Sequence, residues 1–142
     1  MNFENANLYI HAVCTIAMFG LIWFVQIVHY PLFHQVGRDA FVEYELRHQR
    51  LTTIVVAPLM IGEIATALAL LYFESELRWI WALVGFGLVF LIWLSTLCLQ
   101  MPCHRKLESG YDAEVVRRLV RTNWLRAWAW AGRVVIAIYL LM

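Results

Sequence analysis

Histidine side chains in two polar segments of this chain have the chemistry to bind a metal ion or to move protons. Residues 29–50 and residues 102–123 hold four of the five histidines: His29, His34, His48 and His104. Glu45 precedes His48 with the Glu-x-x-His spacing that places two side chains on one helix face. Di-iron bundles use this spacing twice with two further glutamates, and here it occurs once, so the pattern does not favour a di-iron site.

A single-metal or haem site remains the stronger prediction for these residues. Imidazole nitrogens bind iron and copper, and carboxylates bind or orient such ligands. We expect the cofactor to be haem or a transition metal (iron or copper) and its ligands to be His29, His48 and His104, with Glu45 as a further ligand or orienting group. A hydrogen-bonded layer is expected around them, made of Gln26, Tyr30, Thr52, Gln100, Asn123 and Arg126. Any one of these histidines taken alone is more often an ordinary interfacial residue.

Two opposite charges lie in the middle of otherwise apolar stretches. Glu63 is central in residues 51–73, and Arg133 is central in residues 124–142. A charge at the centre of a bilayer costs about 2.5–3.5 kcal/mol on insertion scales, so two opposite charges at matching depth are expected to pair. The pair is either a structural pin between two helices or a catalytic site for a substrate or a proton, and the sequence leaves both interpretations open.

The composition shows which elements must position these groups. The chain has 142 residues, of which 63% are hydrophobic and 15% are charged, against about 45–50% and 25% in soluble domains. A net charge of +1 excludes a nucleic-acid partner, and three cysteines do not make a disulfide framework.

Four stretches are apolar for about the 20 residues that a helix needs to cross a bilayer. They are residues 8–28, 51–73, 79–101 and 124–142. We therefore predict an all-α protein whose single domain, residues 1–142, is a bundle of four transmembrane helices.

The basic residues predict the direction of the four spans. Both termini lie on one side of the membrane, and residues 29–50 and 102–123 lie on the other. That second side carries Arg38, Arg47, Arg50, Arg105, Lys106, Arg117, Arg118 and Arg121. By the positive-inside rule, residues 29–50 and 102–123 are cytoplasmic and the termini face the non-cytoplasmic side of a cell inner membrane. The same topology brings His29, His48 and His104 to one end of the bundle.

Several short motifs resemble those of small, mostly uncharacterised bacterial four-helix integral membrane proteins. The motifs are Gln26-x-x-His29-Tyr30-Pro31-Leu32-Phe33, His48-x-Arg50, Pro58 with Glu63, Gln100-x-Pro102-x-His104 and Thr122-Asn123-Trp124-x-Arg126. More distantly, the layout is similar to the anthrone-oxygenase-like family and to the membrane-bound, haem-associated protoporphyrinogen oxidase family. Both resemblances imply an oxidoreductase with a lipophilic substrate, by analogy of layout.

The sequence therefore leaves three alternative functions open. The first is a metal- or haem-dependent oxidoreductase that acts on a lipophilic substrate, in which Glu63 and Arg133 handle protons or substrate polarity. The second is a non-catalytic subunit or assembly factor of a larger membrane complex or homo-oligomer, held together by small residues such as Gly85 and Gly87. The third is a small transporter built around Glu63 and Arg133.

Overall fold

The computed structural model describes residues 3–142, and 92% of the molecule is helical with no strand in the described range. Four long segments make up most of the chain. They are α1 (Phe3–Phe24), α2 (Phe41–Phe73), α3 (Glu76–Ser95) and α5 (Ala113–Leu141). Shorter helices extend or join them: π-helices at Val25–His29 and Thr96–Gln100, 3₁₀ turns at Pro31–Gln35 and Arg38–Ala40, and α4 (Met101–Leu107), which continues α3. The prediction of an all-α bundle is confirmed.

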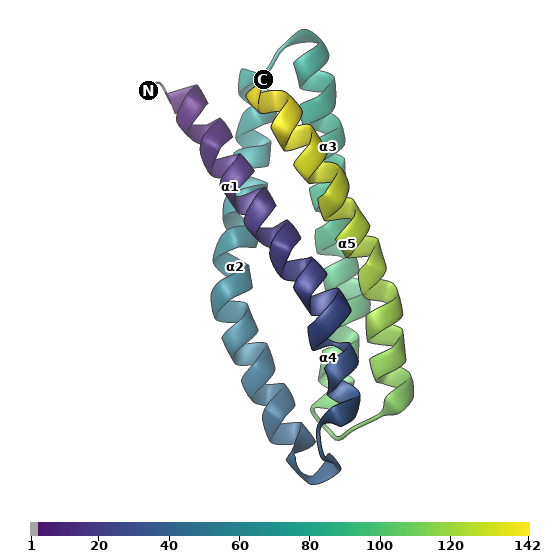
Figure 1. Cartoon of the computed structure of the whole chain (residues 1–142). Helices are drawn as coiled ribbons and strands as arrows, with labels where there is room; N and C mark the ends of the chain where they lie inside the picture. Colours follow the sequence, from purple (N-terminus) through teal and green to yellow (C-terminus); the bar gives the residue numbers. More distant parts are fainter. Residues whose placement is uncertain (1–2) are drawn as a thin grey trace.

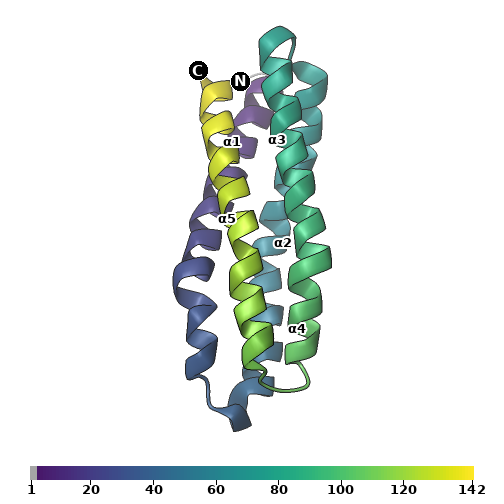
Figure 2. The ribbon, with the colours of Figure 1, turned by 90° about the vertical axis from the view of Figure 1, so that its right-hand side faces the viewer.

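The four long helices run side by side as an elongated bundle (Figures 1 and 2). α1 packs against α2 and α5, and α3 packs against α5 and α2, so each helix has two neighbours around the bundle. Both termini and the turn between α2 and α3 lie at one end, the terminal end (Figure 1). Residues 29–50 and 102–123 form the opposite end, called here the histidine end.

Length and apolarity make these helices suited to a bilayer. Each of the four segments that contain the predicted spans is long and apolar enough to cross a membrane: 3–35, 38–73, 76–107 and 113–141. Large apolar side chains such as Ile54, Phe90 and Val135 are exposed on the outside of the bundle, as expected for contact with lipid. The helices are longer than the predicted spans, because the polar segments at the histidine end continue the same helices.

The connection between α4 and α5 follows the local sequence signals. Gly110 has a φ of 143°, which side chains with a Cβ rarely adopt, and it turns the chain between the two helices. Asp112 then caps α5, because its Oδ1 accepts hydrogen bonds from the amides of Glu114 (2.8 Å) and Val115 (3.2 Å). These bonds hold the pKa of Asp112 below its ordinary value.

The two π-helices lie in the half of the bundle that leads to the histidine end. In the first, the amide of Tyr30 donates to the carbonyl of Val25 (2.9 Å), five residues back instead of four. Such a widened turn shifts every following side chain around the helix axis. Gln26 in the first π-helix, Tyr30 directly after it and Gln100 in the second π-helix are all buried in the bundle.

Candidate functional site

The predicted gathering of histidines at one end of the bundle is present, but the rings contact one another directly. His29 Nε2 lies 2.8 Å from His48 Nδ1, and the hydroxyl of Thr52 lies 3.1 Å from the same nitrogen. The ring centroids of His29 and His48 are 4.5 Å apart, and those of His48 and His104 are 5.6 Å apart. Within residues 3–142, no hydrogen bond to the other ring nitrogen of His48, Nε2, is found.

His104 is held from both sides. Its Nδ1 lies 2.5 Å from Glu45 Oε1, and its Nε2 lies 3.1 Å from the Tyr30 hydroxyl. Glu45 is fully buried, and Gln49 donates a further hydrogen bond to the same carboxylate oxygen (3.1 Å). A carboxylate bonded to one ring nitrogen fixes the tautomer of a histidine and its orientation. Glu45 therefore positions His104, as the orienting interpretation of the sequence predicts.

A cavity of about 390 Å³ opens beside these histidines, between α2 and the continuation of α3 into α4. Its polar end is lined by Tyr30, His48, Gln49, Thr52, Gln100, His104 and Arg126. Toward the middle of the bundle its wall is mostly apolar, with Val56, Ala57, Met60, Trp93 and Leu97 beside Thr53 and Thr96, while Met101 lies next to Gln100 at the polar end. The mouth also includes Arg105 and Glu108. A hollow that is apolar at one end and polar at the other suits an amphiphilic molecule, and we call it the histidine cavity.

The predicted hydrogen-bonded layer is present only in part. Tyr30 and Thr52 bond to His104 and His48, as expected. Gln26 and Asn123 instead bond to each other, with Asn123 Nδ2 donating to Gln26 Oε1 (2.8 Å), and Gln26 also donates to the carbonyl of Val120 (3.1 Å). They join α5 to the first π-helix and do not touch the histidines.

Gln100 and Arg126 belong to the cavity wall. Gln100 accepts a hydrogen bond from Ser95 (3.0 Å) and donates to Thr122 (3.2 Å). The guanidinium of Arg126 lies 5.4 Å from the centre of the Trp130 ring, in a cation–π arrangement. The exposed His34 does not line the cavity and bonds to the hydroxyl of the half-buried Tyr111 (2.7 Å).

The arrangement of these donors does not fit the expected metal. Among residues 3–142, no group of three or more histidine, cysteine or acidic side chains is arranged to hold a metal ion. Two nitrogens that share a tetrahedral metal are about 3.3 Å apart, from bond lengths of about 2.0–2.1 Å, whereas His29 and His48 approach to the 2.8 Å of a hydrogen bond. Both nitrogens of His104 are also occupied, by Glu45 and Tyr30. The prediction that His29, His48 and His104 bind metal or haem thus finds no support in the geometry.

The predicted contact between Glu63 and Arg133 is confirmed at the middle of the bundle. Arg133 Nε donates to Glu63 Oε1 (2.8 Å), and both side chains are buried. Thr15 donates to the same oxygen (2.9 Å), and Trp130 Nε1 donates to Glu63 Oε2 (3.0 Å). Arg133 Nη1 also donates to the carbonyl of Gly85. Neither Glu63 nor Arg133 lines the histidine cavity, and the contacts of this midplane network link α1, α2, α3 and α5.

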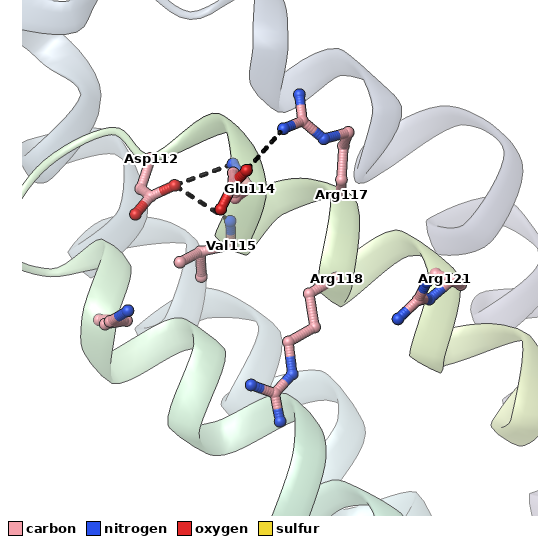
Figure 3. Close-up of a pocket in the computed structure, with 7 residues that line it drawn as sticks. Asp112, Glu114, Val115, Arg117, Arg118 and Arg121 are labelled. Carbon is pink, nitrogen blue, oxygen red and sulfur yellow. Dashed lines mark hydrogen bonds and ion pairs between the residues drawn. The ribbon is translucent and has the colours of Figure 1, made fainter.

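A second hollow at the histidine end, of about 540 Å³, has a different character. It is lined by Lys106, Asp112, Glu114, Val115, Arg117, Arg118 and Arg121. Arg117 reaches Glu114 at 3.5 Å, and Arg118 and Arg121 follow further along α5 (Figure 3). Its lining contains no histidine or cysteine and its arginines are exposed. We therefore take the smaller histidine cavity as the candidate site.

Three partners in these networks were not predicted from the sequence. Thr15 and Trp130 complete the bonds of Glu63, and Gln49 bonds to Glu45. Trp130 could have been found, because it lies three residues before Arg133 on the same helix face. Thr15 carries no comparable signal, since hydroxyl side chains are common in membrane helices.

Comparison with known proteins leaves the chain without an assigned family: no family matches it, and no curated protein or solved structure is similar enough to count as a match.

Proposed function

We propose that this protein binds a lipid-soluble molecule with a hydroxyl or carbonyl head group in the histidine cavity and exchanges a proton with it. The observation that carries the proposal is the cavity itself. Its apolar end lies toward the middle of the bundle, beside Met60 and Trp93, and its polar end holds His48, His104 and Tyr30. A substrate dissolved in the membrane enters such a cavity from the side, with its tail along the apolar wall.

His48 is the group that exchanges the proton. Its Nδ1 is engaged by His29 and Thr52, which leaves Nε2 to face a ligand. When the Nδ1 hydrogen is donated to His29, Nε2 carries a lone pair and accepts a proton from a hydroxyl group. His29 stabilises the His48 ring in that tautomer. In this pair His48 is the base and His29 is the group that orients it. The Tyr30 hydroxyl, which is bonded to His104, supplies a further hydrogen bond to the head group.

Oxidoreduction is the reaction class that we favour for this site. Removal of hydrogen from a hydroxyl group begins with the proton transfer that His48 can perform, and the resemblance to oxidoreductase families points the same way. The reaction also requires an electron acceptor. Because the histidines do not fit a metal, we assign to this chain's residues only substrate binding and proton exchange.

A neutral quinone tests the binding step. Wild-type protein in lipid nanodiscs should bind a benzoquinone with a decyl tail, read as quenching of tryptophan fluorescence, since Trp93 lines the cavity. A quinone carbonyl only accepts, so this probe engages the other His48 tautomer, in which Nδ1 accepts from His29 and Nε2–H donates to the carbonyl. His48→Gln should weaken binding about 5–10-fold, the value of one hydrogen bond of about 1 kcal/mol. Ala57→Phe should abolish binding, because the ring fills the apolar end of the cavity.

His34→Gln is the matched control, because His34 lies at the same end of the bundle but bonds to Tyr111 outside the cavity. It should bind the quinone as tightly as wild type does. Equal binding by wild type and Ala57→Phe would overturn the proposal.

We also propose that the histidine end faces the cytoplasm across a cell inner membrane. The support is the concentration of arginines in residues 29–50 and 102–123, against Arg78 alone at the terminal end. Ser109 and Ser75 are exposed at opposite ends of the bundle. A membrane-impermeant maleimide added to intact cells should label Ser75→Cys and not Ser109→Cys, and the reverse pattern would invert the topology.

A non-catalytic subunit or assembly factor is the second candidate function. The observation that favours it is a tryptophan group on the outer surface, where Trp23 packs edge-on to Trp124 and Trp128, and Trp128 is 62% exposed. Stable co-purification with a larger complex in mild detergent, lost in Trp128→Ala but not in Ala57→Phe, would favour this function.

The transporter alternative needs access to Glu63 and Arg133, which are both buried in the core.

A further inference from the structure

Arg126 is a buried cation that lines the histidine cavity without an acidic partner. Its side chain is 6% exposed, and it takes part in none of the ion pairs found within residues 3–142. Its Nε is buried and makes no hydrogen bond. The Tyr30 hydroxyl and the face of Trp130 lie beside it, and both are neutral groups.

A buried guanidinium cannot lose its charge to reduce this cost, because its pKa is too high. Burial of such a group is costly unless an anion or a set of acceptors compensates it. The other titratable or charged groups at the cavity are Tyr30, His48, His104, Arg105 and Glu108, with Glu45 behind His104. Glu45 is engaged by His104 and Gln49, and Glu108 lies exposed at the mouth. Neither carboxylate neutralises Arg126.

We infer that Arg126 is the counter-ion for an oxyanion formed on the substrate, so that the substrate is a lipid-soluble phenol or enol. This inference rests on the proposed function and names the chemical class of its substrate. The substrate's O–H bond breaks, the bonding electron pair stays on the oxygen, and the proton forms a new N–H bond at His48 Nε2. The oxyanion accepts hydrogen bonds from the guanidinium of Arg126, which lines the cavity. An ionised acceptor makes these bonds about twice as strong as neutral ones.

An ionisable chromophore tests the inference directly. The probe is 4-nitrophenol with a decyl chain, whose phenolate absorbs visible light at a wavelength where the neutral phenol does not. Bound to wild-type protein in nanodiscs, its apparent pKa should lie at least one unit below the value in protein-free nanodiscs, which is a tenfold shift in its ionisation equilibrium. Arg126→Gln should remove most of this shift.

Two controls separate the inference from the proposed function. Arg121→Gln removes an exposed arginine from the same helix and should keep the full shift. The methyl ether of the probe cannot ionise, and it should bind wild type and Arg126→Gln equally, which also shows that the variant is folded.

Binding of probe and ether to wild type with no shift in the probe's pKa overturns the inference and leaves the proposed function standing. Failure of both to bind overturns the proposed function as well, and a full shift in Arg126→Gln removes Arg126 as the counter-ion.

Discussion

Two polar networks lie at different depths of this bundle, and they use the same kinds of side chain in different ways. The midplane network surrounds Glu63, whose two carboxylate oxygens accept from Thr15, Trp130 and Arg133 with all four residues buried. The network at the histidine end surrounds Glu45 and His104 and borders a cavity of about 390 Å³. A network whose two carboxylate oxygens are both bonded inside the core holds helices together, whereas one that borders a cavity can act on a ligand.

The two networks are connected through one tryptophan. Trp130 donates its indole N–H to Glu63 and presents its ring face to Arg126 in the cavity wall. The midplane network thus fixes the orientation of a residue at the histidine cavity. This arrangement predicts that midplane variants damage stability first, while variants at the histidine end damage binding first.

Removal of the midplane charge should have the largest effect. Glu63→Gln leaves Arg133 buried without its carboxylate partner, and breaking a buried pair in this way costs about 3–5 kcal/mol. Unfolding of the detergent-solubilised protein should show this loss. The double variant Glu63→Leu with Arg133→Leu should be more stable than either single variant, because no charge remains buried. A double variant less stable than both singles would contradict the structural role of the pair.

Crowding beside the midplane network should have the next largest effect. A Cβ at Gly62 would lie 3.1 Å from the sulfur of Cys14, at the contact between α1 and α2. Gly62→Leu should therefore destabilise the protein by about 1–3 kcal/mol, as in other overpacked cores. Gly20 has no atom within 4 Å of such a Cβ, so Gly20→Leu should be neutral or slightly stabilising, because leucine has the higher helix propensity. Equal losses in both variants would show that packing around Glu63 is not tight.

The substitution Glu45→Gln places the same chemical change in the other network. Its partner His104 can be neutral, so no permanent charge is stranded, and the loss of stability should be about 1 kcal/mol or less. Binding of the decyl benzoquinone should weaken several-fold, because His104 loses the carboxylate that orients it. If Glu45→Gln destabilised the protein as much as Glu63→Gln does, the proposed difference in role between the two networks would be contradicted.

Asp112 at the start of α5 should show the smallest effect, since it belongs to neither network. Its pKa is lowered by the amides of Val115 and Glu114, so its contribution to stability is present above its ordinary pKa of 3.8 and is lost as the pH falls through the lower, folded value. Asp112→Ala should lower the Tm by about 2–4 °C at neutral pH and by less at pH 3. Asp112→Asn, which can still cap the helix, should retain most of the Tm. A gap between wild type and Asp112→Ala that widens toward acid would contradict this account.

The fold and the pairing of charges could be predicted from the sequence because both depend on position along the membrane normal. Depth in a transmembrane helix follows from residue number, which is why Glu63 and Arg133 were expected to meet and His29, His48 and His104 to gather. The way in which three rings face one another depends on helix rotation instead. The π-helix at Val25–His29 changes that rotation next to His29. Residue numbers could therefore place the three histidines at one depth, but they could not show that His29 and His48 bond to each other.

The role of Arg126 shows the same limit. The sequence predicts that Arg126 lies near the histidine end, in a hydrogen-bonded layer around the ligands. That its side chain is buried without a carboxylate, against Trp130 and beside a cavity, depends on which partners reach it from other helices. Absence of a partner is a property of the packed bundle, and no single segment of sequence encodes it.

Photo-crosslinking of a membrane-dissolved ligand tests the central claim most directly. A benzoquinone with a diazirine on its tail, activated in nanodiscs with wild-type protein, should label the apolar wall of the histidine cavity at Val56, Met60, Trp93 or Leu97, and an excess of unlabelled quinone should suppress that labelling. Labelling spread over lipid-exposed residues such as Ile54, Phe90 and Val135, unaffected by competitor, would contradict the claim that this cavity is a binding site.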